Sequence, residues 1–171
     1  MSHGKNVRVD AVEYSSVAVK KFKERVRGEQ RIKVIRADMF DYLRKSPPSR
    51  YDALYANAVF HFLSTEERRK LYQLAYEALR PNGILAISFK AYGDILQARG
   101  KKIKDTSSGV TIRGNDGITR LFVRKIAPII KELERGGFHF RKSYKWAVRG
   151  YNLPHKDSRF VGLIAIKRLS L

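Results

Sequence analysis

Short apolar runs alternate with amphipathic segments most clearly between residues 51 and 89, where the pattern predicts strand, helix and strand. The apolar run at 53–56 is too short for a helix and is bounded by polar residues. Apolar residues then recur at helical spacing over 71–79, which gives a helix one apolar face. The sequence Pro-Asn-Gly at 81–83 ends that helix, because proline cannot continue the hydrogen-bond ladder. Residues 83–89 fit a buried parallel strand, so the succession predicts a βαβ unit.

The flanking segments continue this alternation. Ser64 and Glu67 have the spacing of a capping box at a helix start. Helical periodicity returns over 118–133 but contains Pro128, so we expect a kink or two helices meeting there, with Pro128 near a helix start. The glycine-rich, charged segment 90–117 is interpreted as a mobile loop or lid. The other expected elements are a strand over 7–12, a helix capped by Ser15 or Ser16 and closed by Gly28, a strand over 32–35, a helical turn over 40–44, and antiparallel strands over 138–148 and 159–168.

These elements predict one α/β domain over residues 1–171, with a polar N-terminus at 1–6. Its sheet is expected to be mostly parallel, with an antiparallel C-terminal strand pair and helices on both faces. The chain has no cysteine, which excludes disulfides, thiolate catalysis and cysteine-ligated zinc and fits a reducing compartment. It shows no signal-peptide core and no apolar run of membrane-spanning length, so we predict a cytoplasmic protein. We predict no metal site, because His155 and Asp157 in the last hairpin loop are only two candidate ligands.

The formal charge of +20 is the outlying feature of the composition, and it favours polyanionic partners, with nucleic acid first and RNA preferred. The alternative is a solvated basic surface. Tyr144 and Trp146 lie among basic residues as a stacking surface would require, but their shared parity on a strand is equally explained by burial. The basic residues we select for nucleic-acid contact are Arg99, Lys101, Lys102 and Lys104.

The order of these parts resembles class I S-adenosylmethionine-dependent methyltransferases over nearly the whole chain. The stretches that carry the resemblance are VDAVEYS at 9–15, ADMFDYL at 37–43, YDALYANAVFHFLS at 51–64, ALRPNGILAIS at 78–88, and ERGGF with RFVGLIAIKR near the end. The resemblance implies a Rossmann-like sheet and S-adenosylmethionine as the cofactor. It also implies methyl transfer to an acceptor that the sequence does not identify, with RNA as a candidate.

The resemblance assigns roles to individual residues. Glu13 matches the acidic residue that holds the ribose hydroxyls, and Asp38 matches the one that meets the adenine amino group. Met39 follows with a backbone N–H and an apolar contact to the ring. The loop that lines the cofactor and the methyl-transfer space carries over as Asn57, Ala58 and His61, with His61 and Asn57 as the catalytic candidates.

Each of these residues has a structural alternative. Glu13 and Asp38 could cap the turns that follow their strands, and Asn57 could be an ordinary loop residue. His61 lies among apolar residues, so a packed, hydrogen-bonded histidine is an equal interpretation.

The family opens with a strand and a glycine-rich turn, and this sequence begins at what would be the second strand. The resemblance therefore implies a sheet with its first strand absent. Three interpretations remain open: the flanking strands pair directly, a second copy supplies a strand in a homodimer, or the chain is a truncated product. The alternative function is a non-catalytic module of methyltransferase fold that binds nucleic acid or a partner subunit.

Overall fold

The computed structural model describes residues 7–150 and 157–168, and the polar N-terminus predicted at 1–6 lies outside them. The chain separates into two compact units, Met1–Ser46 and Pro47–Leu171, where the sequence analysis expects one domain. Each unit is described by itself.

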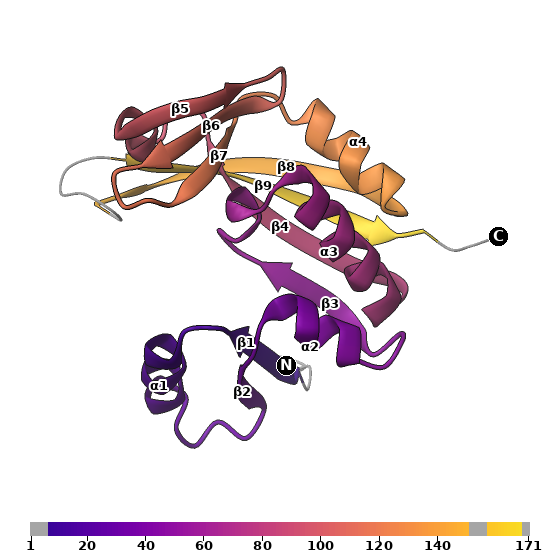
Figure 1. Ribbon diagram of the computed structural model, residues 1–171. Coiled ribbons are helices and arrows are strands. Elements are labelled where there is room, and N and C mark those ends of the chain that lie inside the picture. The colour runs from indigo at the N-terminus through magenta and orange to yellow at the C-terminus, as the bar shows by residue number, and fades with distance from the viewer. Residues whose placement is uncertain (1–6, 151–156, 169–171) are drawn as a thin grey trace, which may run out of the picture. The chain divides into compact units, whose positions relative to one another are not determined.

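The N-terminal unit is a strand–helix–strand–helix succession (Figure 1). Its elements are β1 (Val9–Glu13), α1 (Ser16–Arg25), β2 (Ile32–Arg36) and α2 (Met39–Lys45). β1 and β2 are parallel and form a two-stranded sheet. Ser15 is the N-cap of α1, because its hydroxyl oxygen accepts a hydrogen bond from the Ala18 N–H at 3.3 Å. All four predicted elements of this unit are confirmed.

The predicted βαβ unit opens the C-terminal unit. Its elements are β3 (Tyr51–Ala56), the 3-10 helix η1 (Phe60–Phe62), α3 (Thr65–Ala78) and β4 (Leu79–Ala91), with β3 and β4 parallel. The capping box is confirmed: the Glu67 N–H donates to the Ser64 hydroxyl, and the Ser64 N–H donates to the Glu67 carboxylate. β4 begins at once after α3, so the Pro-Asn-Gly sequence lies inside the strand, with Asn82 at a φ of 61°.

Residues 90–117, interpreted from the sequence as a mobile loop or lid, contain regular secondary structure. The segment contains the 3-10 helix η2 (Ile95–Ala98) and two antiparallel strands, β5 (Gly100–Asp105) and β6 (Gly109–Gly114). A third strand, β7 (Thr119–Val123), pairs with β6 and lies where helical periodicity was predicted. The helix that follows, α4 (Ala127–Arg135), carries Pro128 in its first turn, so the expected position of the proline is confirmed.

The sheet of this unit has seven strands arranged around β4. One edge of β4 pairs with β3 as far as Ile87 and then with β7 from Lys90 onward, both in parallel. The other edge pairs with β9 (Asp157–Lys167), which is antiparallel and continues to β8 (Phe138–Arg149). The antiparallel C-terminal pair is therefore confirmed. β6 joins β7 and β5 lies beyond it at the edge.

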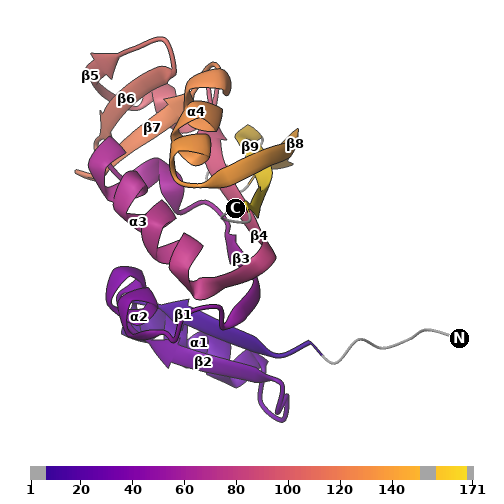
Figure 2. The ribbon, with the colours of Figure 1, turned by 90° about the vertical axis from the view of Figure 1, so that its right-hand side faces the viewer.

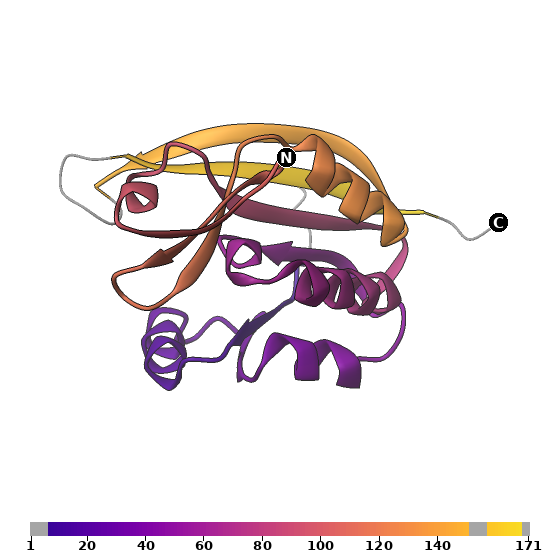
Figure 3. The same ribbon diagram turned by 45° about the horizontal axis from the view of Figure 1, so that its top comes forward.

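Both helices of the C-terminal unit lie on the same side of this sheet (Figures 2 and 3). Between them and the sheet lie Phe60, Tyr72 and Phe89, each at most 1% exposed. The centroid of the Phe60 ring lies 5.4 Å from that of Tyr72 and 5.8 Å from that of Phe89. Large apolar side chains of this kind contribute on the order of 2 kcal/mol each when fully buried. Burial also raises the pKa of the Tyr72 hydroxyl, which has no hydrogen-bond partner among the described residues.

Tyr144 and Trp146 lie two residues apart on β8 and so face the same side, but that side does not bury both side chains. Their rings stack at 5.2 Å, and Trp146 stacks in turn on Phe160, yet Tyr144 remains 39% exposed. Tyr144 lies across Gly162, where a Cβ atom would stand only 2.6 Å from its ring. A glycine on the neighbouring strand thus makes room for the aromatic stack.

Candidate functional site

The two acidic residues predicted to hold the adenosine lie at the carboxyl ends of neighbouring parallel strands. Glu13 ends β1, and its Oε1 accepts a hydrogen bond from the Ser15 N–H at 2.7 Å. Asp38 follows β2 as the N-cap of α2, and its Oδ1 accepts from the Phe40 and Asp41 N–H groups at 2.8 and 3.1 Å. Both carboxylates therefore have the capping role that was the structural alternative.

Capping occupies only one oxygen of each carboxylate. Within residues 7–150 and 157–168, Oε2 of Glu13 and Oδ2 of Asp38 form no hydrogen bond or ion pair. Ionised carboxylates accept several hydrogen bonds, and ligands of open α/β sheets bind at the carboxyl ends of the strands. The free oxygens thus suit ribose hydroxyls and an adenine amino group. Met39, the first residue of α2, follows directly and is partly buried.

In the C-terminal unit, Asn57 and Ala58 form the turn that leaves β3. Ala58 has a φ of 54°, in the left-handed region. Its N–H donates to the Ser88 hydroxyl at 2.7 Å, and that hydroxyl donates to Oδ1 of Asn57, also at 2.7 Å. The turn thus lies where β3 ends its pairing with β4 and β7 begins. Ligands of open α/β sheets bind beyond the carboxyl ends of the strands, and this turn follows the carboxyl end of β3.

His61, the predicted proton acceptor, is 2% exposed within η1. Its Nδ1 has no hydrogen-bond partner in the part of the chain that the structure describes. Burial, together with the charges of Lys90 and Arg120, lowers the pKa of His61 to about 3. A neutral imidazole with so low a pKa is a poor general base at neutral pH. The geometry therefore favours the packed histidine, although without the hydrogen bond that this interpretation included.

Sequence reasoning missed a buried charged pair at the end of β4. Nζ of Lys90 lies 2.9 Å from Oδ2 of Asp94 and 4.2 Å from the centre of the Phe160 ring. Asp94 also accepts hydrogen bonds from the backbone N–H groups of Leu96 and Arg159, both at 2.8 Å. Burial lowers the pKa of Lys90 while Asp94 opposes that shift. The pair joins η2 and β9 to the end of the central strand.

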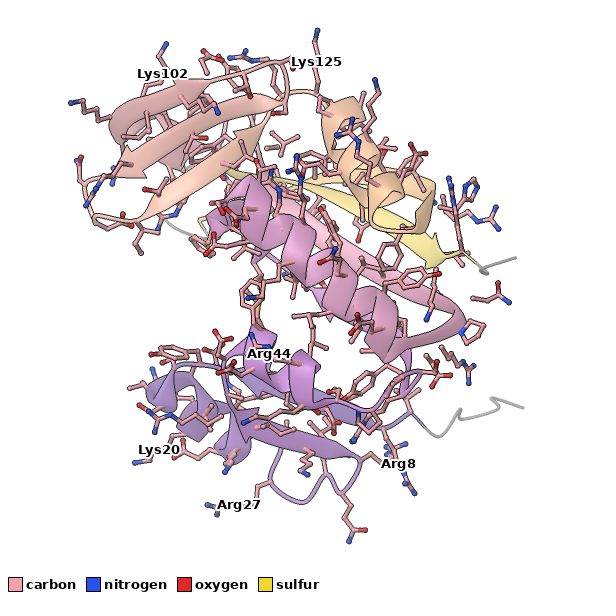
Figure 4. The ribbon with its side chains drawn as sticks, turned by 45° about the vertical axis from the view of Figure 1, so that its right-hand side comes forward. Arg8, Lys20, Arg27, Arg44, Lys102 and Lys125 are labelled. Carbon is pink, nitrogen blue, oxygen red and sulfur yellow. The ribbon has the colours of Figure 1, made fainter. Side chains whose placement is uncertain are left out.

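The four basic residues selected for nucleic-acid contact fall at one edge of the seven-stranded sheet. Arg99 ends η2, and the other three lie on β5, all of whose residues are exposed. Lys101 is opposite Arg113 across the β5–β6 pair, so two positive charges face each other. Lys102 lies 3.7 Å from Asp105 and points away from the sheet (Figure 4).

Two further features of the described residues bear on the class of protein. None of their His, Asp and Glu side chains gather in a group of three that could hold a metal ion. None of their helices combines the length and the hydropathy needed to cross a membrane.

Comparison with known proteins identifies the fold. Residues 1–83 match a family model described as a methyltransferase domain. No curated protein sequence matches the chain. A solved S-adenosylmethionine-dependent methyltransferase of Methanosarcina mazei matches 97% of this chain and 84% of its own, with a TM-score of 0.73 and 12% identity.

Two other solved structures show what the fold supports elsewhere. The 1,6-didemethyltoxoflavin-N1-methyltransferase of Burkholderia thailandensis was solved with 1,6-didemethyltoxoflavin and S-adenosylhomocysteine bound. It matches with a TM-score of 0.68 and 14% identity, covering 95% of this chain and 62% of that one. The [4+2]-cyclase SpnF matches with a TM-score of 0.63 and 15% identity, covering 96% and 67%.

The resemblance seen in the sequence is confirmed: the chain has the fold of class I S-adenosylmethionine-dependent methyltransferases, and its first half matches a methyltransferase family model. Because a cyclase shares this fold, the fold alone does not define the reaction.

Proposed function

We propose that the chain is an S-adenosylmethionine-dependent methyltransferase. The observation that carries the proposal is the pair of acidic residues, Glu13 and Asp38, at the ends of adjacent parallel strands, where one carboxylate oxygen of each has no partner among the described residues. When bound, the cofactor supplies an electrophilic methyl group. Glu13 would hold the ribose hydroxyls, Asp38 the adenine amino group, and Met39 would contribute its backbone N–H and an apolar contact to the ring.

The residues around Asn57 would line the space beside the methyl group. Methyl transfer depends strongly on alignment, so a turn held by Ser88 suits this role. Because His61 is buried and has a pKa of about 3, we do not assign it proton abstraction. The acceptor would then be a group that is nucleophilic without a histidine base. Two classes of methyl acceptor fit this condition. One is a small molecule, like the one bound in the similar Burkholderia structure, and the other is an RNA base.

Isothermal titration calorimetry with S-adenosylmethionine tests the proposal. Glu13→Gln and Asp38→Asn keep the capping oxygen but remove the charge, and each should weaken binding by about tenfold, because a charge-assisted hydrogen bond is lost. Asp41→Asn, which makes the same charge change on α2, should bind as the wild type does. An absence of heat with the wild-type chain at millimolar cofactor would exclude the enzyme.

Nucleic-acid binding is the second function that we propose, in a catalytic or a non-catalytic protein. Lys101 and Lys104 are exposed on β5 and have no acidic partner among the described residues. Lys101 also lies opposite Arg113, and like charges opposite each other destabilise a hairpin unless an anion binds between them. Lysines on an edge strand also prevent pairing with other chains, which is the competing explanation.

Fluorescence polarisation with a labelled single-stranded RNA, measured over a series of salt concentrations, separates these explanations. Lys101→Glu with Lys104→Glu should weaken binding and lower the slope of log affinity against log salt by about 1.4, the loss of two phosphate contacts. Lys20→Glu with Lys21→Glu makes the same charge change on α1 and is the matched control. Equal effects of the two double variants would show a general charge effect without a site on β5.

A homodimer that completes the sheet is a further proposal. Among the strands that the structure describes, β3 pairs only with β4, along one edge, and an unpaired strand edge accepts another strand. Light scattering after size exclusion should then give twice the chain mass of 19.7 kDa, and a monomer mass would reject it.

A further inference from the structure

Ser88 is a buried polar residue in an apolar strand, and its hydroxyl connects β4 to the turn that follows β3. The residue is 1% exposed. Its oxygen accepts the Ala58 N–H, and its single O–H donates to Oδ1 of Asn57, each at 2.7 Å. The whole donor capacity of the hydroxyl is therefore used on Asn57, and the backbone of the next residue is held by the same oxygen.

The bond to Ala58 acts on an unusual backbone conformation. Residues other than glycine seldom adopt a positive φ, and they keep it only when the surrounding structure holds them there. Ala58 has a φ of 54°, and the hydrogen bond from its N–H to Ser88 ties it to the central strand. Ser88 thus stabilises a turn that alanine would not adopt by itself.

The bond to Asn57 decides which part of the amide remains available. Oδ1 is occupied by Ser88, while Nδ2 has no partner among the described residues and the side chain is exposed. The Ser88 bond therefore orients the amide so that the two N–H donors of Nδ2 are available at this edge of the sheet.

We infer that Ser88 is a positioning residue: it fixes the Asn57–Ala58 turn and directs the Asn57 amide so that the amide donates a hydrogen bond to an acceptor atom of the bound ligand. The inference rests on the proposed function, because the ligand is the cofactor. It predicts a carboxylate, carbonyl or ring-nitrogen acceptor of the ligand beside the Asn57 Nδ2.

Calorimetry with S-adenosylhomocysteine as the probe tests the inference. Ser88→Ala should weaken binding by about tenfold, because the turn loses its restraint. Adding Ala58→Gly should restore most of that loss, since glycine adopts positive φ at no steric cost. Asn57→Asp keeps an oxygen toward Ser88 but replaces the N–H donors by oxygen, so it should also weaken binding. Wild-type affinity in Ser88→Ala, or in Asn57→Asp, would overturn the inference.

Two controls separate positioning from simple loss of stability. Ser158→Ala removes another fully buried serine, from β9, and should leave the affinity for the probe unchanged. Unfolding followed by the fluorescence of Trp146 gives a ligand-free readout: Ser88→Ala should cost less stability in the Ala58→Gly variant than in the wild-type chain. Equal costs would refute the restraint on Ala58. If the wild-type chain does not bind the probe, the proposed function fails, while this comparison still decides whether Ser88 holds the turn.

Discussion

Removing one partner of the buried ion pair between Arg68 and Glu132 should strongly destabilise the C-terminal unit. Arg68 on α3 donates from Nε and Nη2 to the two carboxylate oxygens of Glu132 on α4, at 2.8 and 2.9 Å. Its other donors reach the Leu63 carbonyl at 2.8 Å and the Thr65 hydroxyl at 3.1 Å. The side chains of the pair are only 5% and 13% exposed. Both charges are therefore removed from water and depend on each other.

Glu132→Ala should lower the free energy of unfolding by about 3–5 kcal/mol, because it leaves the Arg68 charge buried without its partner. For a chain of this length, that corresponds to a fall in Tm of roughly 6–20 °C. The fluorescence of Trp146, the only tryptophan, follows this unit in thermal and urea unfolding.

The matched control is the exposed ion pair between Arg80 and Asp52 in the same unit. Its atoms are closer, at 2.5 Å, but the side chains are 61% and 71% exposed. Asp52→Ala should therefore cost at most about 1 kcal/mol. The double variant Arg68→Met, Glu132→Leu should recover most of the stability, since apolar residues can replace a buried pair. Equal losses in Glu132→Ala and Asp52→Ala would refute the argument that burial decides the contribution.

Four further predictions concern single positions. Gly109→Ala should cost about 1–3 kcal/mol, because the new Cβ would stand 2.2 Å from the Phe122 carbonyl oxygen. Gly117 has a φ of 74° but open space around it, so urea unfolding of Gly117→Ala should show a smaller loss of about 1 kcal/mol. Tyr72→Phe should leave stability unchanged or raise it, because the buried hydroxyl has no partner among the described residues, and a clear loss in the same assay would contradict this. His61 binds a proton more readily in the unfolded chain, so stability should fall as pH drops from about 6.5 toward 3. In His61→Leu that part of the pH dependence should be absent, and an unchanged profile would contradict the lowered pKa.

Local signals in the sequence were sufficient for the βαβ unit. The Ser64–Glu67 capping box needs only residues within one turn, and the structure forms both of its hydrogen bonds. Pro128 near a helix start is a similarly local prediction, because proline fits the first turn, where its missing N–H is not needed.

The β5–β6 pair was missed because glycine was taken as a sign of a loop. In the structure, Gly100 and Gly109 begin strands at places where the backbone of a neighbouring strand comes very close. A Cβ at Gly100 would stand 2.3 Å from the Arg113 carbonyl oxygen. Glycine in a strand often marks such a close approach, and only the long-range pairing reveals which meaning applies.

The carboxylates at Glu13 and Asp38 show why a binding role and a capping role could not be separated by sequence. The same position, directly after a parallel strand, suits a ligand at the carboxyl edge and the first N–H groups of the next turn. The structure shows that one oxygen of each residue is used for capping and that the other has no partner in the part of the chain that is described. The two roles are therefore compatible in one side chain, and the capping bond orients the free oxygen.

Ser88 and Lys90 did have a signal, since they are polar residues at alternate positions of the strand ILAISFKA. Alternation places them on one face, but it does not show why a buried strand should carry polar groups there. The reason is the change of partner along β4, from β3 to β7, between Ile87 and Lys90. Because β7 was predicted as helix, that divergence could not be foreseen. The assignment of the site residues on β4 therefore depended on a strand more than thirty residues away, whose short apolar run fits either period.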